Sequence, residues 1–418
     1  MLGSIAAFVS RPPRSSLCFM SAYGRPFLLS LIVVSLFVMA QTILWFTLPL
    51  LAFDLNEAGV DLSLIRGVAF VPNIVFAVFI GVINDRIRKR VSFRLYSALL
   101  LVALVALWLG VRSGQISVPA LVLFMIVFNG IGYALGNAHM TLIRLTVAHD
   151  KLSDATALVS GVYATLATVG PAIGGFALLW LGHEGVIGAM TLTMALACLA
   201  AFAVAPDERL PEPARFWPSL AEGWRVFRAN RELVMMTVVI VLTNAAEGAF
   251  SVALLLKLKA ELRLDPSQIG VVIACAGAGS MVASVYAAKL RRRLGYRFAF
   301  FWPIWMLALG YLAVAASGAF LILCTLSFVI GALTLFFDVG IWSYRQETVE
   351  AAHMGRVAGI TGAIFKIGMP PIILLTGLLS DIGWLSQAFI MAAGINAIAA
   401  LFLVFVAGWG WPRRVLAS

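Results

Sequence analysis

The sequence predicts an all-α membrane protein with twelve transmembrane helices. Its 418 residues are 62% hydrophobic and only 12% charged, whereas a soluble globular chain carries roughly 25% charged residues. The hydrophobic residues form long continuous runs instead of the alternating ten-residue segments of a barrel, and only helices or closed barrels satisfy the backbone in lipid. Lys and Arg gather between the runs, as in the cytoplasmic loops of a multi-pass protein.

Each predicted helix corresponds to an apolar run that can cross the hydrocarbon core, which takes about 20 residues of helix. In chain order, the runs lie at 27–53, 67–84, 93–111, 118–140, 155–181, 185–205, 233–256, 269–288, 298–317, 319–344, 357–380 and 384–411.

The distribution of cations orients these spans. An even number of spans puts both termini on one side, and 24 of the 30 Lys and Arg fall in segments on that side. Positive charge is retained in the cytoplasm, so we expect both termini there. The net charge of +11 then reflects topology, and we expect no nucleic-acid partner. The remaining cations are Arg66, Arg112, Lys257, Lys259 and Arg263 on the opposite side, and Lys366 inside a span.

The longest connection divides the spans into six and six. Leu220, Trp224 and Phe227 recur in it at i, i+4 and i+7, which predicts a helix lying in the membrane interface. The expected organisation is a cytoplasmic tail (1–26), an N-terminal six-helix half (27–205), a cytoplasmic linker with the interfacial helix (206–232), a C-terminal six-helix half (233–411) and a C-terminal tail (412–418).

The loop after the second span contains Gly81-Val-Ile-Asn-Asp85-Arg86-Ile-Arg88-Lys89-Arg90. Its spacing, Gly-x-x-x-Asp-Arg-x-x-Lys-Arg, resembles the loop signature of the major facilitator superfamily of secondary transporters. The resemblance implies two six-helix pseudo-repeats with substrate bound between them. It also implies that this loop latches the cytoplasmic side. A generic positively charged loop would explain the cations, but not the acid placed four residues after a glycine. The gating residues are therefore expected to be Gly81, Asp85, Arg86, Lys89 and Arg90.

A glycine motif in the fifth span indicates the direction of transport. The pattern Gly-x8-Gly-Pro-x-x-Gly-Gly resembles the signature of exporters of the drug/proton antiporter kind. Small residues also let membrane helices approach closely, and proline bends a helix, so a packing face alone is the alternative. The motif consists of Gly161, Gly170, Pro171, Gly174 and Gly175.

Two further segments narrow the resemblance. Residues 145–155 and 346–356, which precede the fifth and eleventh spans, look like the enterobactin-exporter and macrolide-efflux branch. This implies a proton-coupled exporter of a siderophore-like metabolite or an amphipathic drug in a bacterial inner membrane. Its expected partners are its substrate, protons and the lipid bilayer, and we expect a monomer.

Three ionisable residues fall inside predicted spans: Glu247, Asp338 and Lys366. Charges in hydrocarbon are costly and are functional hypotheses by default. Asp338 and Lys366 are similar enough in depth to form an ion pair. Glu247 has no obvious cation at its depth, so we expect it to carry the proton; contact with substrate alone is the alternative.

Polar and aromatic residues in the spans are candidates to line a substrate cavity, although each could equally serve as a contact between helices. They are Gln41, Thr42, Trp45, Asn73, Asn129, Tyr133, Asn137, Asn244, Trp342 and Tyr344.

Other functions find less support in the sequence. No Gly-x4-Gly-Lys-Ser/Thr element is present, which argues against ATP as the energy source. The His and Cys residues show no metal spacing, and we expect no enzyme activity, cofactor or metal. The first span lacks the Asp, and the fourth the Arg, that many relatives carry, which leaves the coupling mechanism open. An importer and a lipid or lysolipid flippase remain alternatives.

Overall fold

We describe the fold from a computed structural model, which describes residues 23–76, 80, 84, 87–205, 216–349 and 354–408. Every regular element in these residues is a helix. The bounds are α3 (Arg25–Asn56), α4 (Gly59–Val68), α5 (Val71–Val75), α7 (Lys89–Arg112), α8 (Val118–Thr146), η1 (His149–Lys151), α9 (Leu152–Ala203), α10 (Phe216–Ala229), α11 (Arg231–Leu256), η2 (Lys257–Glu261), α12 (Pro266–Ala316), α13 (Phe320–Thr348), α14 (Met354–Ile364), α15 (Met369–Asp381) and α16 (Leu385–Gly408).

Ten helices in the described part of the chain are long and apolar enough to cross a bilayer. One of them, α9, has 52 residues, and at about 1.5 Å per residue a straight helix of that length would far exceed the hydrocarbon core. It contains Gly182 with φ 63°, and α12 contains Gly295 with φ 77°. Glycine adopts this left-handed backbone without strain. Each glycine ends one helix and starts another, so α9 and α12 each cover two predicted spans.

The second and eleventh spans are interrupted. The predicted span 67–84 was wrong at its start, because α4 already begins at Gly59 and ends at Val68, and α5 follows. The charged residues Asp61 and Arg66 in α4 hid this helix from a search for apolar runs. The predicted span 357–380 was likewise not continuous, since a turn at 365–368 separates α14 from α15.

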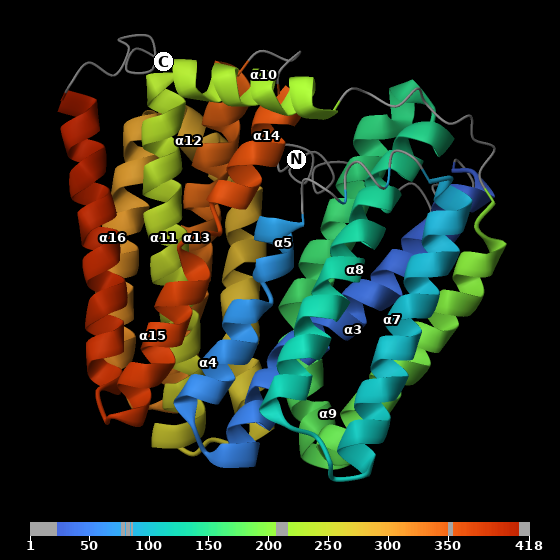
Figure 1. Cartoon of the computed structure of the whole chain (residues 1–418). Helices are drawn as coiled ribbons and strands as arrows, with labels where there is room; N and C mark the ends of the chain where they lie inside the picture. The colour runs from blue at the N-terminus through green and yellow to red at the C-terminus, as the bar shows by residue number, and fades with distance from the viewer. Residues whose placement is uncertain are drawn as a thin grey trace.

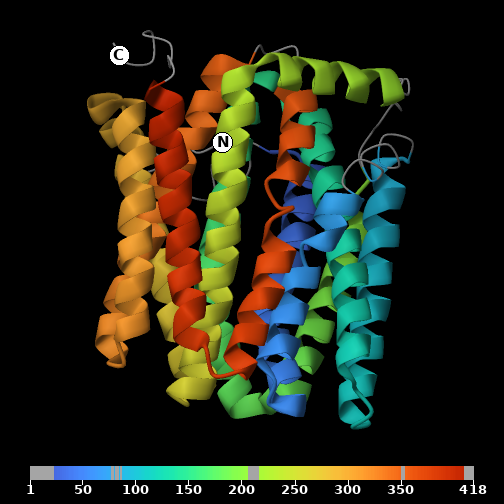
Figure 2. The same cartoon turned by 60° about the vertical axis from the view of Figure 1, so that its left-hand side comes forward.

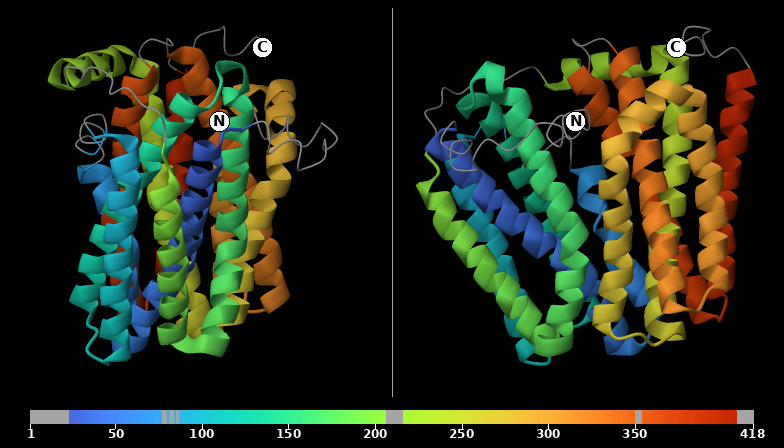
Figure 3. Two further views of the ribbon diagram at one scale, coloured as in Figure 1. Left: turned by 90° about the vertical axis from the view of Figure 1, so that its right-hand side faces the viewer. Right: turned by 180° about the vertical axis from the view of Figure 1, so that it is seen from behind.

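The helices form two groups (Figure 1). The first group contains α3, α5, α7, α8 and α9, with α4 at its boundary, and the second contains α10 to α16. We call the end where α3 begins and α16 ends the near end, and the opposite end the far end. The groups approach each other at the far end and diverge toward the near end (Figure 3). Across the boundary α4 packs against α15, and α9 against α12.

Polar contacts join the two groups at the far end. Asp381, the last residue of α15, accepts hydrogen bonds from the backbone N–H groups of Gly59 (2.5 Å) and Val60 (3.0 Å). The first N–H groups of a helix have no partner within it, and a carboxylate there is favoured by the helix dipole. Asp54 near the end of α3 forms an ion pair with Lys259 of η2 at 2.8 Å. An acid from each group is thus bonded to the other group.

Glycines allow the backbones of α9 and α12 to touch at the same boundary. A Cβ on Gly175 would overlap the carbonyl oxygen of Pro266, and one on Gly270 would lie 2.5 Å from the carbonyl oxygen of Pro171. Neither obstacle is the flexible end of a side chain. Close approach through small residues is a common way to join helices in lipid.

The linker forms helix α10, which crosses the near end at a steep angle to the long helices (Figure 2). Phe227 is buried in a cluster with Leu233, Val349 and Val357, whereas Trp224 is exposed. The predicted helix is therefore present. Of its apolar residues, Phe227 packs on the second group, whereas Trp224 can face the membrane interface.

We predict that Gly175→Ala opens the far end. The new methyl group meets backbone that cannot rotate away, and overpacking of this kind costs about 1–3 kcal/mol, which shifts the equilibrium toward the open far end by about 5- to 150-fold. The measurement is pulsed EPR between spin labels at positions 184 and 263 in a cysteine-free background. Gly161→Ala is the matched control, because a Cβ there has no atom within 4 Å. Equal distance distributions in the two variants would contradict the prediction.

Candidate functional site

A cavity of about 360 Å³ lies at the boundary between the two groups. The first group contributes Asn73 from α5 and Tyr133 from α8. Two isoleucines, two glycines, an alanine and Phe365 complete the walls. Six residues predicted from the sequence thus meet in one cavity: Asn73, Tyr133, Asn244, Asp338, Trp342 and Lys366.

Lys366 reaches this cavity from the break in the eleventh span. The backbone there forms short turns, in which the N–H groups of Lys366 and Met369 bond to the carbonyls of Ala363 and Lys366. Asn244 of α11 donates a hydrogen bond from Nδ2 to the carbonyl of Phe365 at 2.9 Å. Irregular backbone at membrane depth needs such partners inside the protein. The amide of Asn244 therefore holds the break and leaves its Oδ1 available to a ligand.

Asp338 and Lys366 share the cavity without forming an ion pair. The pairing expected from their depths does not occur: no nitrogen–oxygen contact within 4.0 Å joins them among the described residues. The electrostatic neighbour of Asp338 is Glu247 of α11. Asp338 thus lines the cavity with a second acid in its surroundings, and no ion pair within 4.0 Å joins Lys366 to either acid among the described residues.

Glu247 has a cation that the sequence did not reveal. Its electrostatic partner is Arg66 of α4, which was assigned to an outside loop because the start of the second span was placed too late. Arg66 also donates from Nη1 to the carbonyl of Trp45 at 3.2 Å. The spacing of Leu62, Ile65 and Val68 (i, i+3, i+6) was the one signal that could have extended the helix back to include Arg66.

Tyr311 of α12 completes the surroundings of Glu247. It interacts electrostatically with that residue and stacks on Phe250 with ring centroids 4.1 Å apart. Its side chain lies next to that of Asn396 of α16, which is buried. Neither residue was singled out from the sequence.

Three of the predicted cavity residues instead bond to each other between α3 and α8. Asn129 Oδ1 accepts hydrogen bonds from Gln41 Nε2 (3.2 Å) and Trp45 Nε1 (2.9 Å), and its Nδ2 donates to the carbonyl of Met125 (2.8 Å). Asn129 is buried. This network joins α3 to α8. For these three residues the alternative role, a contact between helices instead of a place in the cavity wall, is the one observed.

The remaining candidates also have local partners. Thr42 bonds to carbonyls one turn back in α3, and Asn137 does the same in α8. Tyr344 is buried and donates to Glu232 Oε2 at 2.6 Å. None of the three lines the 360 Å³ cavity.

The glycine motif of the fifth span faces two different helices. A Cβ on Gly170 would lie 2.5 Å from Thr42 Oγ1, and one on Gly174 would lie 3.2 Å from Phe46. These two glycines let α9 pack closely on α3, while Gly175 faces α12 in the other group. Gly161 has open space around it. Pro171 lies inside α9, beside the contact with α12.

The loop predicted to act as a gate is described only in part, since Gly81, Asp85 and Arg86 lie outside the described residues. Lys89 is buried, and its ammonium donates to the carbonyls of Asn84 and Ile87. Asn84 in turn accepts from Tyr96 OH at 2.7 Å and donates to the carbonyl of Ala134 at 2.8 Å. These contacts of Lys89 lie within the first group. Arg90 is exposed at the start of α7.

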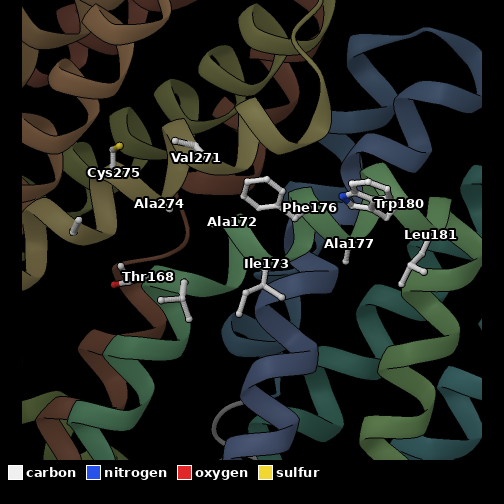
Figure 4. A pocket seen from close by; sticks show the side chains of 12 residues that line it. Thr168, Ala172, Ile173, Phe176, Ala177, Trp180, Leu181, Val271, Ala274 and Cys275 are labelled. Carbon is white, nitrogen blue, oxygen red and sulfur yellow. The ribbon is translucent and has the colours of Figure 1, made fainter.

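A second, larger depression has different chemistry. About 790 Å³ in volume, it lies between α9 and α12 and is lined by apolar side chains and Thr168. Phe176 and Trp180 project over it from α9, and Val271, Ala274 and Cys275 line it from α12 (Figure 4). It offers no charged group to orient a polar substrate. The described residues also contain no group of three His, Cys, Asp or Glu side chains placed to hold a metal.

Comparison with known proteins agrees with this architecture. The chain is 26% identical over 389 residues to y4rN, an uncharacterized MFS-type transporter of Sinorhizobium fredii (strain NBRC 101917 / NGR234), with 90% of each chain covered. Similar solved structures include the nucleoside transporter NupG (TM-score 0.71, 12% identity, 93% of this chain and 100% of that one). Another is an inward-facing bacterial homologue of the iron transporter ferroportin (TM-score 0.73, 13% identity, 91% and 98%).

A third similar structure is that of the D-xylose–proton symporter (TM-score 0.64, 14% identity, 90% of this chain and 96% of that one). At these identities the likeness in structure concerns the fold alone. The family itself follows from sequence, because the profile of the Major Facilitator Superfamily matches residues 30–246 and 236–415. Members of this family are multi-pass membrane transporters, not enzymes, and bind small molecules within the membrane. The chain belongs to the Major Facilitator Superfamily.

Proposed function

We propose that the protein is a secondary active exporter of a small organic molecule, working by alternating access and proton antiport. The observation that carries this proposal is the cavity lined from both groups of helices. A site between two groups that are joined at one end and diverge at the other can change its exposure when the groups rock. We take the groups to be two six-helix pseudo-repeats, with both termini in the cytoplasm and the far end outside.

The contacts at the far end support closure on the outside in this conformation. Asp381 bonds to the start of α4, and Asp54 pairs with Lys259. Opening the far end would separate both sets of partners. We assign the opposite latch to the loop containing Gly81, Asp85, Arg86, Lys89 and Arg90, on the resemblance of its motif.

Glu247 and Arg66 provide the coupling in this scheme. They lie on opposite sides of the boundary, in α11 and α4, and attract each other while Glu247 is ionised. Protonation of Glu247 removes that attraction, so proton binding and the separation of the groups are linked. The titratable groups near Glu247 are the guanidinium of Arg66, the carboxyl of Asp338 and the phenol of Tyr311. The first favours the ionised form of Glu247, and the second disfavours it.

Export, rather than import, is supported by the motif from Gly161 to Gly175, and the substrate is expected to be a siderophore-like metabolite or an amphipathic drug. Lipid or lysolipid transport is the second candidate. It is favoured by the apolar depression between α9 and α12, which could hold an acyl chain beside the boundary.

Transport into everted membrane vesicles tests the proposal. Ethidium, a catecholate siderophore and a fluorescent lysophospholipid would be supplied outside, with and without an imposed gradient that is acidic inside. Accumulation that requires the gradient supports proton-coupled export. Accumulation of the lysophospholipid alone would favour the second candidate, and uptake only in right-side-out vesicles would indicate an importer.

We predict that Glu247→Gln abolishes transport driven by a pH gradient and preserves exchange of substrate across the membrane. The amide cannot release a proton but keeps the size of the side chain. Gradient-driven accumulation should fall at least about tenfold, while counterflow with equal substrate and equal pH on both sides continues. Asp150→Asn, at an exposed site in η1, is the control. Unchanged gradient-driven transport in Glu247→Gln would remove this residue from the coupling mechanism.

We also predict that Asp381→Ala weakens closure of the far end. Loss of a carboxylate at a helix start costs about 0.5–2 kcal/mol, a shift of about 2- to 30-fold in the equilibrium. The matched control is Asp61→Ala, because Asp61 also lies in the first turn of α4 but bonds to Asn56 in its own group. Accessibility of a cysteine in the cavity to an outside thiol reagent measures the effect. Equal reaction rates in both variants would contradict it.

A further inference from the structure

We propose that the 360 Å³ cavity recognises a zwitterion, a small molecule that carries both an ammonium and a carboxylate group beside an apolar or aromatic part. The inference rests on the proposed function only in taking this cavity as the substrate site. It goes beyond that function by stating which charges the substrate carries.

The first argument is the balance of charges. Glu247 has Arg66 as an electrostatic neighbour across the boundary, although no ion pair within 4.0 Å joins them among the described residues. Asp338 and Lys366 both line the cavity, and no hydrogen bond or ion pair of either side chain is found among the described residues. Uncompensated charges at membrane depth are expensive. A ligand with one positive and one negative group would compensate both at once.

The second argument is the separation of Asp338 from Lys366. If these two side chains were only a structural pair, they would be in contact, because their attraction at membrane depth is strong. They lie on different helices, α13 and the α14–α15 break, with the cavity between them. The hydrogen bond from Asn244 to the carbonyl of Phe365 fixes the backbone next to Lys366. The cavity thus presents an acid and a base, from different helices, that do not contact each other.

The third argument concerns the walls. Trp342 is 41% exposed, and the guanidinium of Arg345 lies 4.0 Å from the centroid of its ring. Arg345 is itself buried and donates to Thr361 at 3.2 Å, so the indole is held in position. A fixed aromatic wall next to Ile240 and Ile341 suits an apolar or planar group.

These positions define how a ligand would lie. Its ammonium group would face Asp338, with Asn244 Oδ1 as a second acceptor, and its carboxylate would face Lys366. Asn73 and Tyr133 would contact it from the first group. A ligand bound in this way touches both groups, which is what a substrate of an alternating-access transporter must do.

The test compares ligands that differ only in charge. L-Phenylalanine is the zwitterion, N-acetyl-L-phenylalanine retains only the carboxylate, and L-phenylalaninamide retains only the ammonium. Binding to the purified full chain in detergent would be measured by calorimetry without any pH gradient. We expect the zwitterion to bind at least about tenfold more tightly than either derivative.

Two variants assign the charges. In Lys366→Met the affinity for the zwitterion should fall to that for the amide, because the carboxylate has lost its partner. In Asp338→Asn it should fall to that for the acetylated compound, because the ammonium has lost its partner. The double variant Asp338→Lys with Lys366→Asp should restore the preference for the zwitterion. This reversal separates recognition from a merely structural role, and thermal melting checks that each variant is folded.

The same comparison is made with glycyl-L-phenylalanine, its N-acetyl derivative and its amide. In this dipeptide the ammonium and the carboxylate are farther apart than in phenylalanine. The proposal is overturned if neither zwitterion binds more tightly than its blocked derivatives, or if the preference survives in both single variants. Because no gradient is used, these results are independent of coupling and direction. Zwitterion binding without proton-driven transport would refute the proposed function and leave this inference intact.

Discussion

The fold depends on one constraint: in hydrocarbon, every backbone N–H and C=O must find its partner within the protein. Long helices satisfy it within each segment. The places where a helix is broken or begins are therefore the informative ones. At the turn 365–368 the side chain of Asn244 supplies a donor, and at the far end the start of α4 receives the carboxylate of Asp381. The turn borders the cavity, and the start of α4 lies where the two groups meet.

Three acids have partners in the opposite group: Asp54, Asp381 and Glu247. Other ion pairs lie within one group, as between Arg112 and Glu184 or between Arg291 and Glu347. An attraction that crosses the boundary changes when the boundary opens, whereas a pair inside a group can stay as it is. The three acids are consequently the ones that can connect ligand, proton and conformation.

Much of this architecture could be predicted from sequence, because apolar runs report directly on burial in lipid. The all-helical fold and the superfamily followed from such runs and from the loop motif. The residues of the cavity were predicted only in part: Asn73, Asn244, Asp338 and Lys366 meet there, but Asn129 and Tyr344 are bonded elsewhere. Helical position does not show which polar neighbour lies across a contact. Arg66 was misplaced because α4 is short and charged, and hydropathy alone cannot recognise such a helix.

The interruptions of the second and eleventh spans have a mechanical consequence. The two broken helices pack on each other piece by piece, α4 against α15 and α5 against α14, so the boundary contains two pairs of short helices joined by turns. The pair α4 and α15 is fastened by Asp381, while the pair α5 and α14 borders the cavity. Such an arrangement can bend at its turns, so the cavity wall can shift while α4 and α15 stay in contact. Bending of this kind lets the two groups rock without breaking the contacts of the far-end pair first.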